Sequence, residues 1–252
     1  MHLHVVTVDL TNPAVHLVVA PAGKGPDAEG VWETTMQHVR EVAQQEDLAI
    51  AVNGDFFMNK EVEFIAGRKV PYFVGNWARV CGWAMSDGRL WSERDVEPSL
   101  VVHKDGKVTI EFFRAPPRDA WQIVSGSAQI VTFGRNTGAY DDPAPRTAVG
   151  VDAEGKKLVL LVVDGRRPEY SAGMSTADEA NEMIRLGCPD ALNLDGGGST
   201  TMVMRNARGD AWNVINRPSD GHDLFIPLSL ERAVASVLGV RIDKSVTSQP
   251  HP

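Results

Sequence analysis

The feature that most constrains this chain is a run of three consecutive glycines, Gly196 to Gly198, directly after an apolar segment. Glycine loses more backbone freedom on folding than any other residue, so three in a row indicate a backbone path that side chains would block. Residues 192–204 read Leu-Asn-Leu-Asp-Gly-Gly-Gly-Ser-Thr-Thr-Met-Val-Met, which predicts a strand on each side of the run. The glycine amides can form a concave set of N–H donors for an anion. Around them stand the polar residues Asn193, Asp195, Ser199, Thr200 and Thr201.

Two better known glycine loops do not fit this run. A Walker loop needs Lys and then Ser or Thr after its last glycine, with a helix behind it, whereas Gly198 is followed by Ser-Thr-Thr-Met-Val-Met. The dinucleotide fingerprint spreads its glycines as G-x-G-x-x-G at the start of a helix, and these three are contiguous. Two interpretations stay open: a site that binds an anionic group, and a tight β-connection with glycines for packing alone.

Length and charge limit the class of protein. We predict one domain over residues 1–242 and a flexible C-terminal tail over residues 243–252, because no linker-like stretch divides the 252 residues. The net charge is −8 with Lys and Arg scattered, so no nucleic-acid partner is expected. The longest apolar run, Leu158 to Val163, is too short to cross a bilayer, and the N-terminus lacks a signal segment, so no membrane contact is expected. Cys81 and Cys188 leave the redox compartment open.

Turn signals indicate a chain rich in antiparallel hairpins. Short polar stretches that contain Asp or Glu before Gly separate apolar segments at residues 86–88, 104–107 and 152–156. We interpret Asp87 and Asp105 as turn residues. The sequence therefore predicts a core of hairpin-connected strands.

Only two segments combine helical spacing with a capping box. Thr34 with Gln37 opens the first, which is predicted to run to about Gln45. Thr176 with Glu179 opens the second, which is predicted to stop at Gly187. We therefore predict a single α+β domain with a mixed, largely antiparallel β-sheet core and a few helices.

Further strands are predicted to deliver polar residues to one end of the sheet. The apolar segment 48–52 runs into Asn53-Gly54-Asp55, although Asn-Gly-Asp is also a strong turn signal. The segment 158–163 is apolar on both faces, so it is predicted to be covered on both sides, and it ends at Asp164. Arg146 begins another strand. Because sites collect at strand ends, we expect Asn53, Asp164, Asp195 and Arg146 to line one pocket.

Several ordered motifs together carry a resemblance to a known family. They are Arg146-Thr147-Ala148-Val149-Gly150, Asp164-Gly165-Arg166, Ser171-Ala172-Gly173-Met174-Ser175, the run from Asn193 to Val203, Asn216-Arg217-Pro218-Ser219 and Glu231-Arg232-Ala233-Val234. Over residues 3–242 the chain resembles the phosphodiester glycosidase family. The resemblance implies removal of a sugar joined through its anomeric oxygen to phosphate, with an N-acetylglucosamine-like sugar on a glycan or exopolysaccharide as the expected substrate. It also suggests an extracytoplasmic or secreted location if a leader has been removed.

The implied chemistry assigns roles to residues. Cleavage passes through an oxocarbenium-like state that needs a nearby carboxylate, for which we predict Asp195, with Asp164 as the second acid or base. The phosphate needs an arginine fork and backbone amides, which we assign to Arg146 and the residues from Gly196 through Gly197 and Gly198 to Ser199. Asp55 stands where the family often has a small residue and adds a carboxylate. The other predicted substrate-binding residues are Asn53, Asn193, Thr200, Arg166 and Arg232, although an exposed salt bridge is an alternative for each of the two arginines.

Two other classes of function compete. A metal-dependent phosphodiesterase would use Asp55, Asp164 and Asp195 as oxygen ligands for Mg or Ca, although no cofactor is required by the preferred hypothesis. A non-catalytic glycan-binding module would display an aromatic platform, for which Trp77, Trp83 and Trp91 are candidates. The histidines near the N-terminus, His2, His4 and His16, are interpreted as strand residues that face solvent.

Overall fold

The computed structural model describes residues 1–65, 68–94, 97–220 and 230–243, so all but the first residue of the predicted tail lie outside the described part. Strands make up 43% of the chain and helices 9%. Every strand pair in the described part is antiparallel. The predicted α+β class with a mixed sheet is therefore wrong: the chain is mostly β. Short turns between successive strands return the chain antiparallel to itself, so parallel crossovers through helices are not needed.

Six strands form the first sheet, and its register places β16 between β17 and β18. In spatial order the strands are β1 (Leu3–Asp9), β17 (Lys157–Val163), β16 (Arg146–Val151), β18 (Asp190–Asn193), β14 (Ala128–Thr132) and β15 (Arg135–Asn136). All side chains of β17 after Lys157 are buried, which confirms the prediction of a strand covered on both faces.

Two five-stranded sheets complete the core. The second sheet consists of β2 (Val15–Pro21), β21 (Ser236–Ile242), β4 (Ile50–Asn53), β19 (Met202–Arg205) and β20 (Trp212–Val214). The third consists of β10 (Arg89–Ser92), β9 (Ala84–Ser86), β13 (Ala120–Ser125), β11 (Ser99–His103) and β12 (Val108–Glu111). Two predicted hairpin turns, at 86–88 and 104–107, lie in the third sheet and are confirmed, as is the third at 152–156 between β16 and β17.

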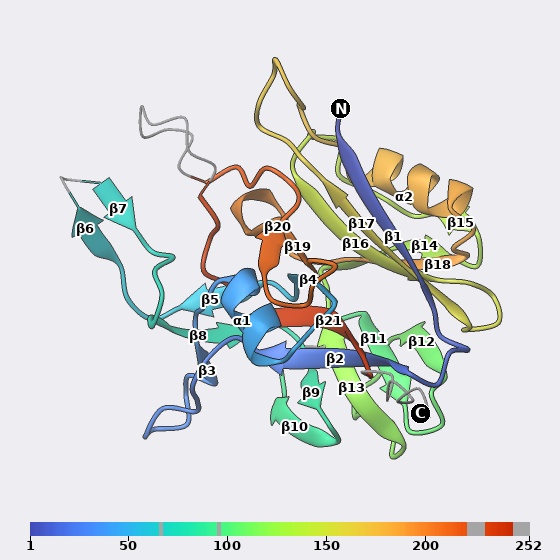
Figure 1. Cartoon of the computed structure of the whole chain (residues 1–252), viewed down its shortest axis with the longest axis horizontal. Helices are drawn as coiled ribbons and strands as arrows, with labels where there is room; N and C mark the ends of the chain where they lie inside the picture. Colours follow the sequence, from blue (N-terminus) through green and yellow to red (C-terminus); the bar gives the residue numbers. More distant parts are fainter. Residues whose placement is uncertain (66–67, 95–96, 221–229, 244–252) are drawn as a thin grey trace, which may run out of the picture.

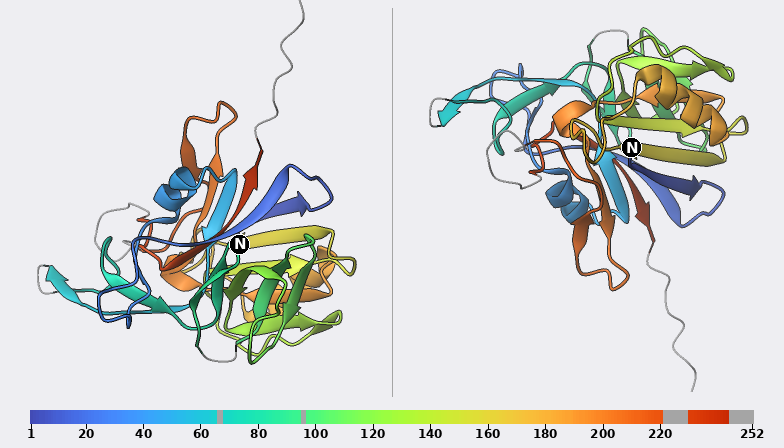
Figure 2. Two further views of the ribbon diagram at one scale, coloured as in Figure 1. Left: turned by 90° about the horizontal axis from the view of Figure 1, so that it is seen from below. Right: turned by 90° about the horizontal axis from the view of Figure 1, so that it is seen from above.

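The three large sheets share one apolar core. In the left view of Figure 2, the second sheet, with β2 and β4 in blue and β21 in red, lies above the yellow strands of the first sheet and the green strands of the third. Buried residues from all three sheets meet there, among them Val52, Leu100, Leu160 and Leu192. The small remaining sheets are formed by β3 (Thr34–Thr35), β8 (Trp77–Val80) and β5 (Phe57–Asn59), and by β6 (Glu63–Ile65) and β7 (Arg68–Val70). The core thus fixes the ends of strands from different sheets relative to one another.

The first helix is shorter than its sequence pattern predicts, and the second begins earlier and stops before Gly187 as predicted. Thr34 lies in β3 and not at a helix cap, so α1 spans only Val39–Gln45. The second helix, α2 (Thr176–Arg185), begins one residue earlier than expected because Ser175 caps it and its hydroxyl accepts the Asp178 amide at 3.0 Å. Figure 1 shows α2 on the outer face of the first sheet, where Met183 belongs to one buried cluster with Ala148 and Leu161. Among the described residues, neither helix is long and apolar enough to span a membrane.

Candidate functional site

The three glycines form a tight turn between two strands. β18 ends at Asn193 and β19 begins at Met202, as predicted, and Gly197–Ser199 make one turn of 3-10 helix between them. Gly197 has a φ of +62°, a left-handed conformation that favours glycine, and its amide donates to the Pro145 carbonyl at 2.9 Å. The run therefore lies against the start of β16 as well as at the end of β18.

Asn53 joins this turn to two other strands. Its side-chain amide donates to the Asp195 carbonyl at 2.5 Å, while its Oδ1 accepts from the Thr147 hydroxyl at 2.8 Å and the Thr201 amide at 3.2 Å. The Asp195 amide in turn donates to the Gly54 carbonyl at 3.0 Å. Asn53 is fully buried, so these bonds satisfy a polar group that would otherwise destabilise the core. The predicted convergence of Asn53 with Asp195 is thus present in the structure.

Two neighbouring carboxyl groups have raised pKa values. Burial raises the pKa of Asp195 to about 6, while the Ser199 hydroxyl, Arg232 and the Gly196 amide oppose the shift. The Gly196 amide donates to Asp195 Oδ1 at 2.8 Å, whereas the Ser199 hydroxyl falls short of hydrogen-bond geometry. Burial also raises the pKa of Asp55 to about 7, and the nearby Asp195 raises it further. Asp195 is therefore mostly ionised at neutral pH, when Asp55 is partly protonated.

Asp55 is held in place by a main-chain amide and a serine hydroxyl. Its carboxylate accepts the Gly82 amide at 2.8 Å, and its own amide donates to the Ser236 hydroxyl at 3.0 Å. The side chain is buried, and Glu97 is a second acidic neighbour that raises its pKa. Asp55 thus adds to this strand end a carboxyl group whose charge depends on pH near neutrality.

Two arginines cover the glycine turn. Arg166 has a φ of +58°, a strained conformation for a residue with a side chain. A Cβ added to Gly197 would come within 2.8 Å of the Arg166 guanidinium, and one added to Gly198 would overlap that of Arg232. Only glycine leaves room for both guanidinium groups against this backbone. Their positive charges also oppose the raised pKa of Asp195.

Arg232 is fixed by two residues that the sequence analysis did not identify. Its Nε and Nη2 bind the Asp220 carboxylate at 2.7 and 2.9 Å, and its Cζ lies 3.9 Å from the centre of the Tyr72 ring. The salt bridge that was an alternative for Arg232 is therefore present, on one edge of the guanidinium. Asp220 directly follows the Asn216-Arg217-Pro218-Ser219 motif, which was the available signal, whereas nothing in the sequence marked Tyr72.

Asp164 lies buried at the end of β17 with both oxygens engaged. Oδ1 accepts the Asn216 side-chain amide at 3.1 Å and the Arg217 main-chain amide at 2.8 Å. Oδ2 lies 3.2 Å from the Tyr170 hydroxyl and 3.3 Å from His4 Nε2. Asp164 thus holds the segment that leads to Asp220. Its assignment as second acid or base stays a prediction.

The Arg146 side chain lies on the face of the first sheet that is turned away from Asn53. Its guanidinium donates to the carbonyls of Met174 and Asp142, each at 2.9 Å. The adjacent Thr147 side chain bonds Asn53, and successive side chains of a strand face opposite sides. The structure therefore brings the Arg146 backbone to the glycine turn, while the charged group lies beside α2. Its assignment to phosphate stays a prediction.

Comparisons with known proteins agree on one family. The profile of the phosphodiester glycosidase family matches residues 46–241. The chain belongs to this family. N-acetylglucosamine-1-phosphodiester alpha-N-acetylglucosaminidase of Bos taurus is 28% identical over 203 residues, which are 74% of this chain and 36% of the bovine protein. An uncharacterized SPbeta prophage-derived protein of Bacillus subtilis, YomE, is 26% identical over 155 residues, 60% of this chain and 20% of that protein. The matched part of the chain thus spans about a fifth of the length of one relative and about a third of the length of the other.

A solved phosphodiester glycosidase has a similar fold. The zebrafish N-acetylglucosamine-1-phosphodiester alpha-N-acetylglucosaminidase catalytic domain, auto-inhibited by its pro-peptide, aligns with a TM-score of 0.68 and 22% identity. The alignment covers 96% of this chain and 83% of that one. The family's fold therefore extends over nearly the whole chain.

Several buried polar groups next to the glycine run in sequence lack hydrogen-bond partners. Among the described residues, no hydrogen-bond partner is found for Asn193 Oδ1 or for the hydroxyls of Thr200 and Thr201, all buried. The other end of the Asn193 amide donates to the Ser127 hydroxyl at 2.9 Å. Buried polar atoms of this kind are ordinarily satisfied by ordered water, so a site for bound water fits here.

The aspartates do not form a metal site in the described part of the chain. No group of three or more His, Cys, Asp or Glu side chains there has an arrangement that could hold a metal ion. Asp164 already accepts hydrogen bonds at both oxygens, and Asp55 accepts a main-chain amide. Nothing in this donor set therefore favours the metal-dependent phosphodiesterase alternative.

Proposed function

We propose that this protein hydrolyses the bond between the anomeric carbon of a sugar and a phosphodiester, and that Asp195 is the carboxylate next to that carbon. One observation carries the proposal: the Asp195 carboxylate accepts the Gly196 amide at 2.8 Å, and two guanidinium groups lie against the same turn. An oxocarbenium-like transition state is stabilised by such a carboxylate, which serves as nucleophile or as base for water. The sugar expected is N-acetylglucosamine-like, as in the names of the relatives.

Arg166 and Arg232 are the proposed phosphate ligands. Each lies against the backbone of a site glycine, and Arg232 keeps one edge free of Asp220 because only Nε and Nη2 bind that carboxylate. The amides of Gly196, Gly197 and Ser199 already donate to Asp195 Oδ1 and to the carbonyls of Pro145 and Gly196, so the two arginines are proposed to bind the phosphate in place of the predicted turn amides. Planar guanidinium groups bind phosphate oxygens through paired hydrogen bonds. This arrangement would hold the phosphate monoanion close to Asp195 despite the repulsion between the two negative charges.

Asp55 is the proposed second carboxyl of the site. Its pKa is raised to about 7 by burial, whereas Asp195 has a pKa of about 6, so the two groups differ in charge over this range. Pairs of carboxyls whose environments separate their pKa values are typical of acid–base sites. A protonated Asp55 would limit the negative charge beside the substrate. Phosphate is a good leaving group, so a strong general acid is less necessary than for ordinary glycosides.

A screen of sugar 1-phosphodiesters tests the proposed function. The full chain would be incubated with methyl phosphodiesters of α-N-acetylglucosamine, α-glucose and α-mannose 1-phosphate, with NMR of the products. Release of free sugar and methyl phosphate from at least one of them is expected. Release of the sugar 1-phosphate and methanol would instead show phosphodiesterase activity, and binding without turnover would indicate a glycan-binding module.

A further inference from the structure

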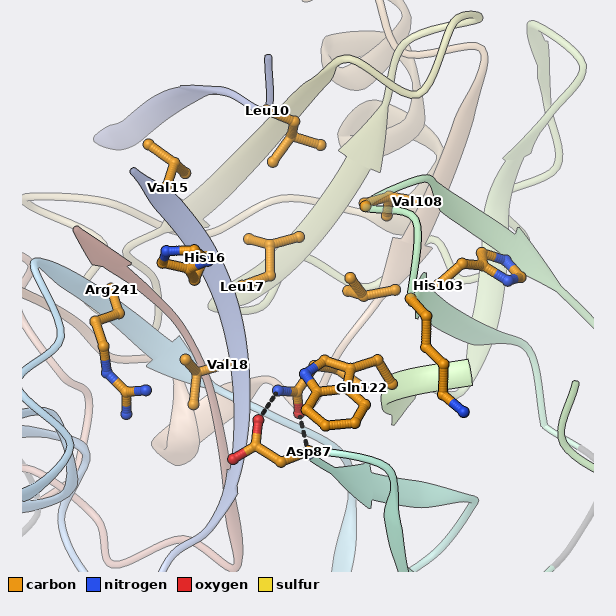
Figure 3. Close-up of a pocket in the computed structure, with 14 residues that line it drawn as sticks. Leu10, Val15, His16, Leu17, Val18, Asp87, His103, Val108, Gln122 and Arg241 are labelled. Carbon is orange, nitrogen blue, oxygen red and sulfur yellow. Dashed lines mark hydrogen bonds between the residues drawn. The ribbon is translucent and has the colours of Figure 1, made fainter. Parts of the chain in front are cut away.

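A second hollow of about 350 Å³ lies between the outer edge of β2 and the third sheet, and it shares no lining residue with the candidate site (Figure 3). Its lining includes the apolar side chains of Leu10, Leu17 and Val108, which Figure 3 labels. Asp87, Lys104 and Trp121 also line it. Its volume is in the range of sites for small ligands, which combine apolar surface with a few polar groups.

The edge of β2 offers free main-chain groups to this hollow. β2 is the outermost strand of its sheet, and alternate residues turn away from β21. Val19 is one of these, because its amide donates to Gln122 Oε1 at 3.3 Å and its carbonyl accepts from the Ser86 hydroxyl. Leu17, two residues earlier, therefore also turns its N–H and C=O outward. Neither the N–H nor the C=O of Leu17 has a hydrogen-bond partner among the described residues. Leu17 also lines the hollow.

Trp121 provides an open aromatic face. The side chain is 41% exposed, although large aromatic residues usually bury most of their surface. Its ring rests on the β9–β10 turn, where a Cβ added to Gly88 would come within 2.9 Å of the ring, and the Gly88 amide donates to the Trp121 carbonyl at 2.7 Å. The ring is therefore held in a fixed orientation with one part open to the hollow.

Two charged groups beside this ring are free to bind a ligand. Asp87 uses Oδ1 to accept the Gln122 side-chain amide at 2.8 Å, as Figure 3 shows, and its Oδ2 has no partner in the described part of the chain. The Lys104 ammonium likewise bonds no described residue. By contrast, both ring nitrogens of His103 are within hydrogen-bond distance of other side chains.

We propose that this hollow, the Trp121 groove, is a binding subsite for a saccharide unit of a glycan. The apolar face of a pyranose ring would stack on Trp121, sugar hydroxyls would donate to Asp87, and Lys104 and the Leu17 amide would donate to sugar oxygens. Trp83, one of the tryptophans predicted as a platform, is only 4% exposed and cannot serve. The proposal goes beyond the hydrolytic function and does not depend on it.

An added peptide strand fits the groove less well. Strand addition uses a row of unpaired main-chain groups along a sheet edge. Here Val19 is bonded by side chains, and the Val15 amide donates to the Asn12 carbonyl at 3.0 Å. In the described part of this edge, Leu17 is therefore where both main-chain groups are free. A compact ligand with hydroxyl groups matches this short edge better than an extended chain.

Titration of the ¹⁵N-labelled full chain with chitotriose, cellotriose and maltotriose tests the proposal. At least one trisaccharide should shift the Trp121 indole and Leu17 amide signals. Trp121→Ala should weaken that binding by about tenfold, the loss expected when a stacking contact is removed. Phe133→Ala, which removes an aromatic side chain that is 86% exposed elsewhere, should leave it unchanged.

A second variant guards against loss of folding in Trp121→Ala. Lys104→Met keeps the aliphatic stem but removes the ammonium, and it should weaken binding several-fold while the melting temperature stays unchanged. Turnover of a small sugar phosphodiester should be the same in all these variants. The proposal fails if no trisaccharide shifts the two signals, or if both groove variants bind as the wild type does. Shifts at Leu17 with an extended Val-Thr peptide and with no saccharide would also overturn it.

Discussion

The Asn53 side-chain amide donates to the Asp195 main-chain carbonyl at 2.5 Å, across 142 positions of sequence. This bond, with the bond from the Asp195 amide to the Gly54 carbonyl, fixes the end of β4 against the end of β18. The backbone of Asp195 is therefore held on both sides, and its carboxylate has a defined direction. Preorganisation of this kind is what a charged group needs to stabilise a transition state without moving.

Replacement of Asp195 by Asn should abolish most turnover without loss of binding. Asn keeps the shape of the side chain but removes the charge that stabilises the oxocarbenium-like state, so kcat should fall by about a thousandfold or more. Steady-state kinetics on a hydrolysed sugar phosphodiester, with calorimetry for affinity, measure the two effects. The matched control is Asp105→Asn in an exposed turn. Near-normal turnover by Asp195→Asn would remove this residue from the reaction.

Lysine substitutions of arginines should separate phosphate binding from structural support. Arg166→Lys keeps the charge but loses the planar fork, so KM for phosphodiesters should rise by about tenfold while an activated aryl glycoside without phosphate is little affected. Arg146→Lys should instead lower the melting temperature and affect both substrates alike, because its guanidinium bonds two main-chain carbonyls. Arg185→Lys, on the surface of α2, is the control. If instead Arg146→Lys raised KM for phosphodiesters alone and Arg166→Lys affected both substrates alike, Arg146 would be the phosphate ligand.

The activity should fall as pH rises through about 7 because of Asp55. Its raised pKa means that it gains a negative charge in this range, beside Asp195 and Glu97 and close to the proposed phosphate. Asp55→Asn should keep kcat/KM constant between pH 7 and 9, where the wild type loses activity. Ser236, which bonds the Asp55 amide and does not titrate there, offers the control Ser236→Ala. If Asp55→Asn lost activity between pH 7 and 9 as the wild type does, the proposed role of Asp55 in the pH dependence would be contradicted.

Glu179 should make the fold less stable as pH rises. Burial raises its pKa to about 8, and neither carboxyl oxygen has a partner among the described residues. The folded state therefore binds the proton more tightly than the unfolded state. The stability that this group contributes is fully present below about pH 4.5 and is lost as pH rises toward 8. At pH 7, Glu179→Gln should raise the free energy of unfolding by on the order of 3 kcal/mol. Urea denaturation against pH, with exposed Glu29→Gln as control, checks this.

The sequence predicted the parts of this fold that depend on local chemistry. Turn residues such as Asp87 and Asp105 marked hairpins, and the apolar run before Asp164 marked a buried strand, because both signals are contained within a few residues. The helix expected from Thr34 did not form there, since Thr34 pairs with Ala78 in a strand. Pairing with a distant segment overrode a short capping pattern, which sequence alone does not reveal.

The site was predicted in outline but not in its contacts. Asn53 and Asp195 were expected together because both follow apolar strands, and they are bonded to each other. The side on which Arg146 points depends on strand register, which fixes all side chains of a strand at once. Tyr72 reaches Arg232 from a separate loop, so no local pattern could have placed it there.

Removal of metal ions should leave the proposed hydrolysis unchanged. The site residues bond one another and main-chain groups, and arginines supply the positive charge for phosphate. Activity after dialysis against EDTA, and after addition of Mg²⁺ or Ca²⁺, should therefore stay within about twofold of the starting value, a negligible barrier change. Loss in chelator with recovery on adding either ion would favour the metal-dependent phosphodiesterase.

The bond that is cleaved tests the central claim most directly. A glycosyl phosphodiester that the enzyme turns over would be hydrolysed in water enriched in ¹⁸O, and mass spectrometry would locate the label. Attack at the anomeric carbon, assisted by Asp195, predicts ¹⁸O in the released sugar and none in the phosphate product. Label in the phosphate product would place the attack on phosphorus and contradict the assignment of this site to a phosphodiester glycosidase.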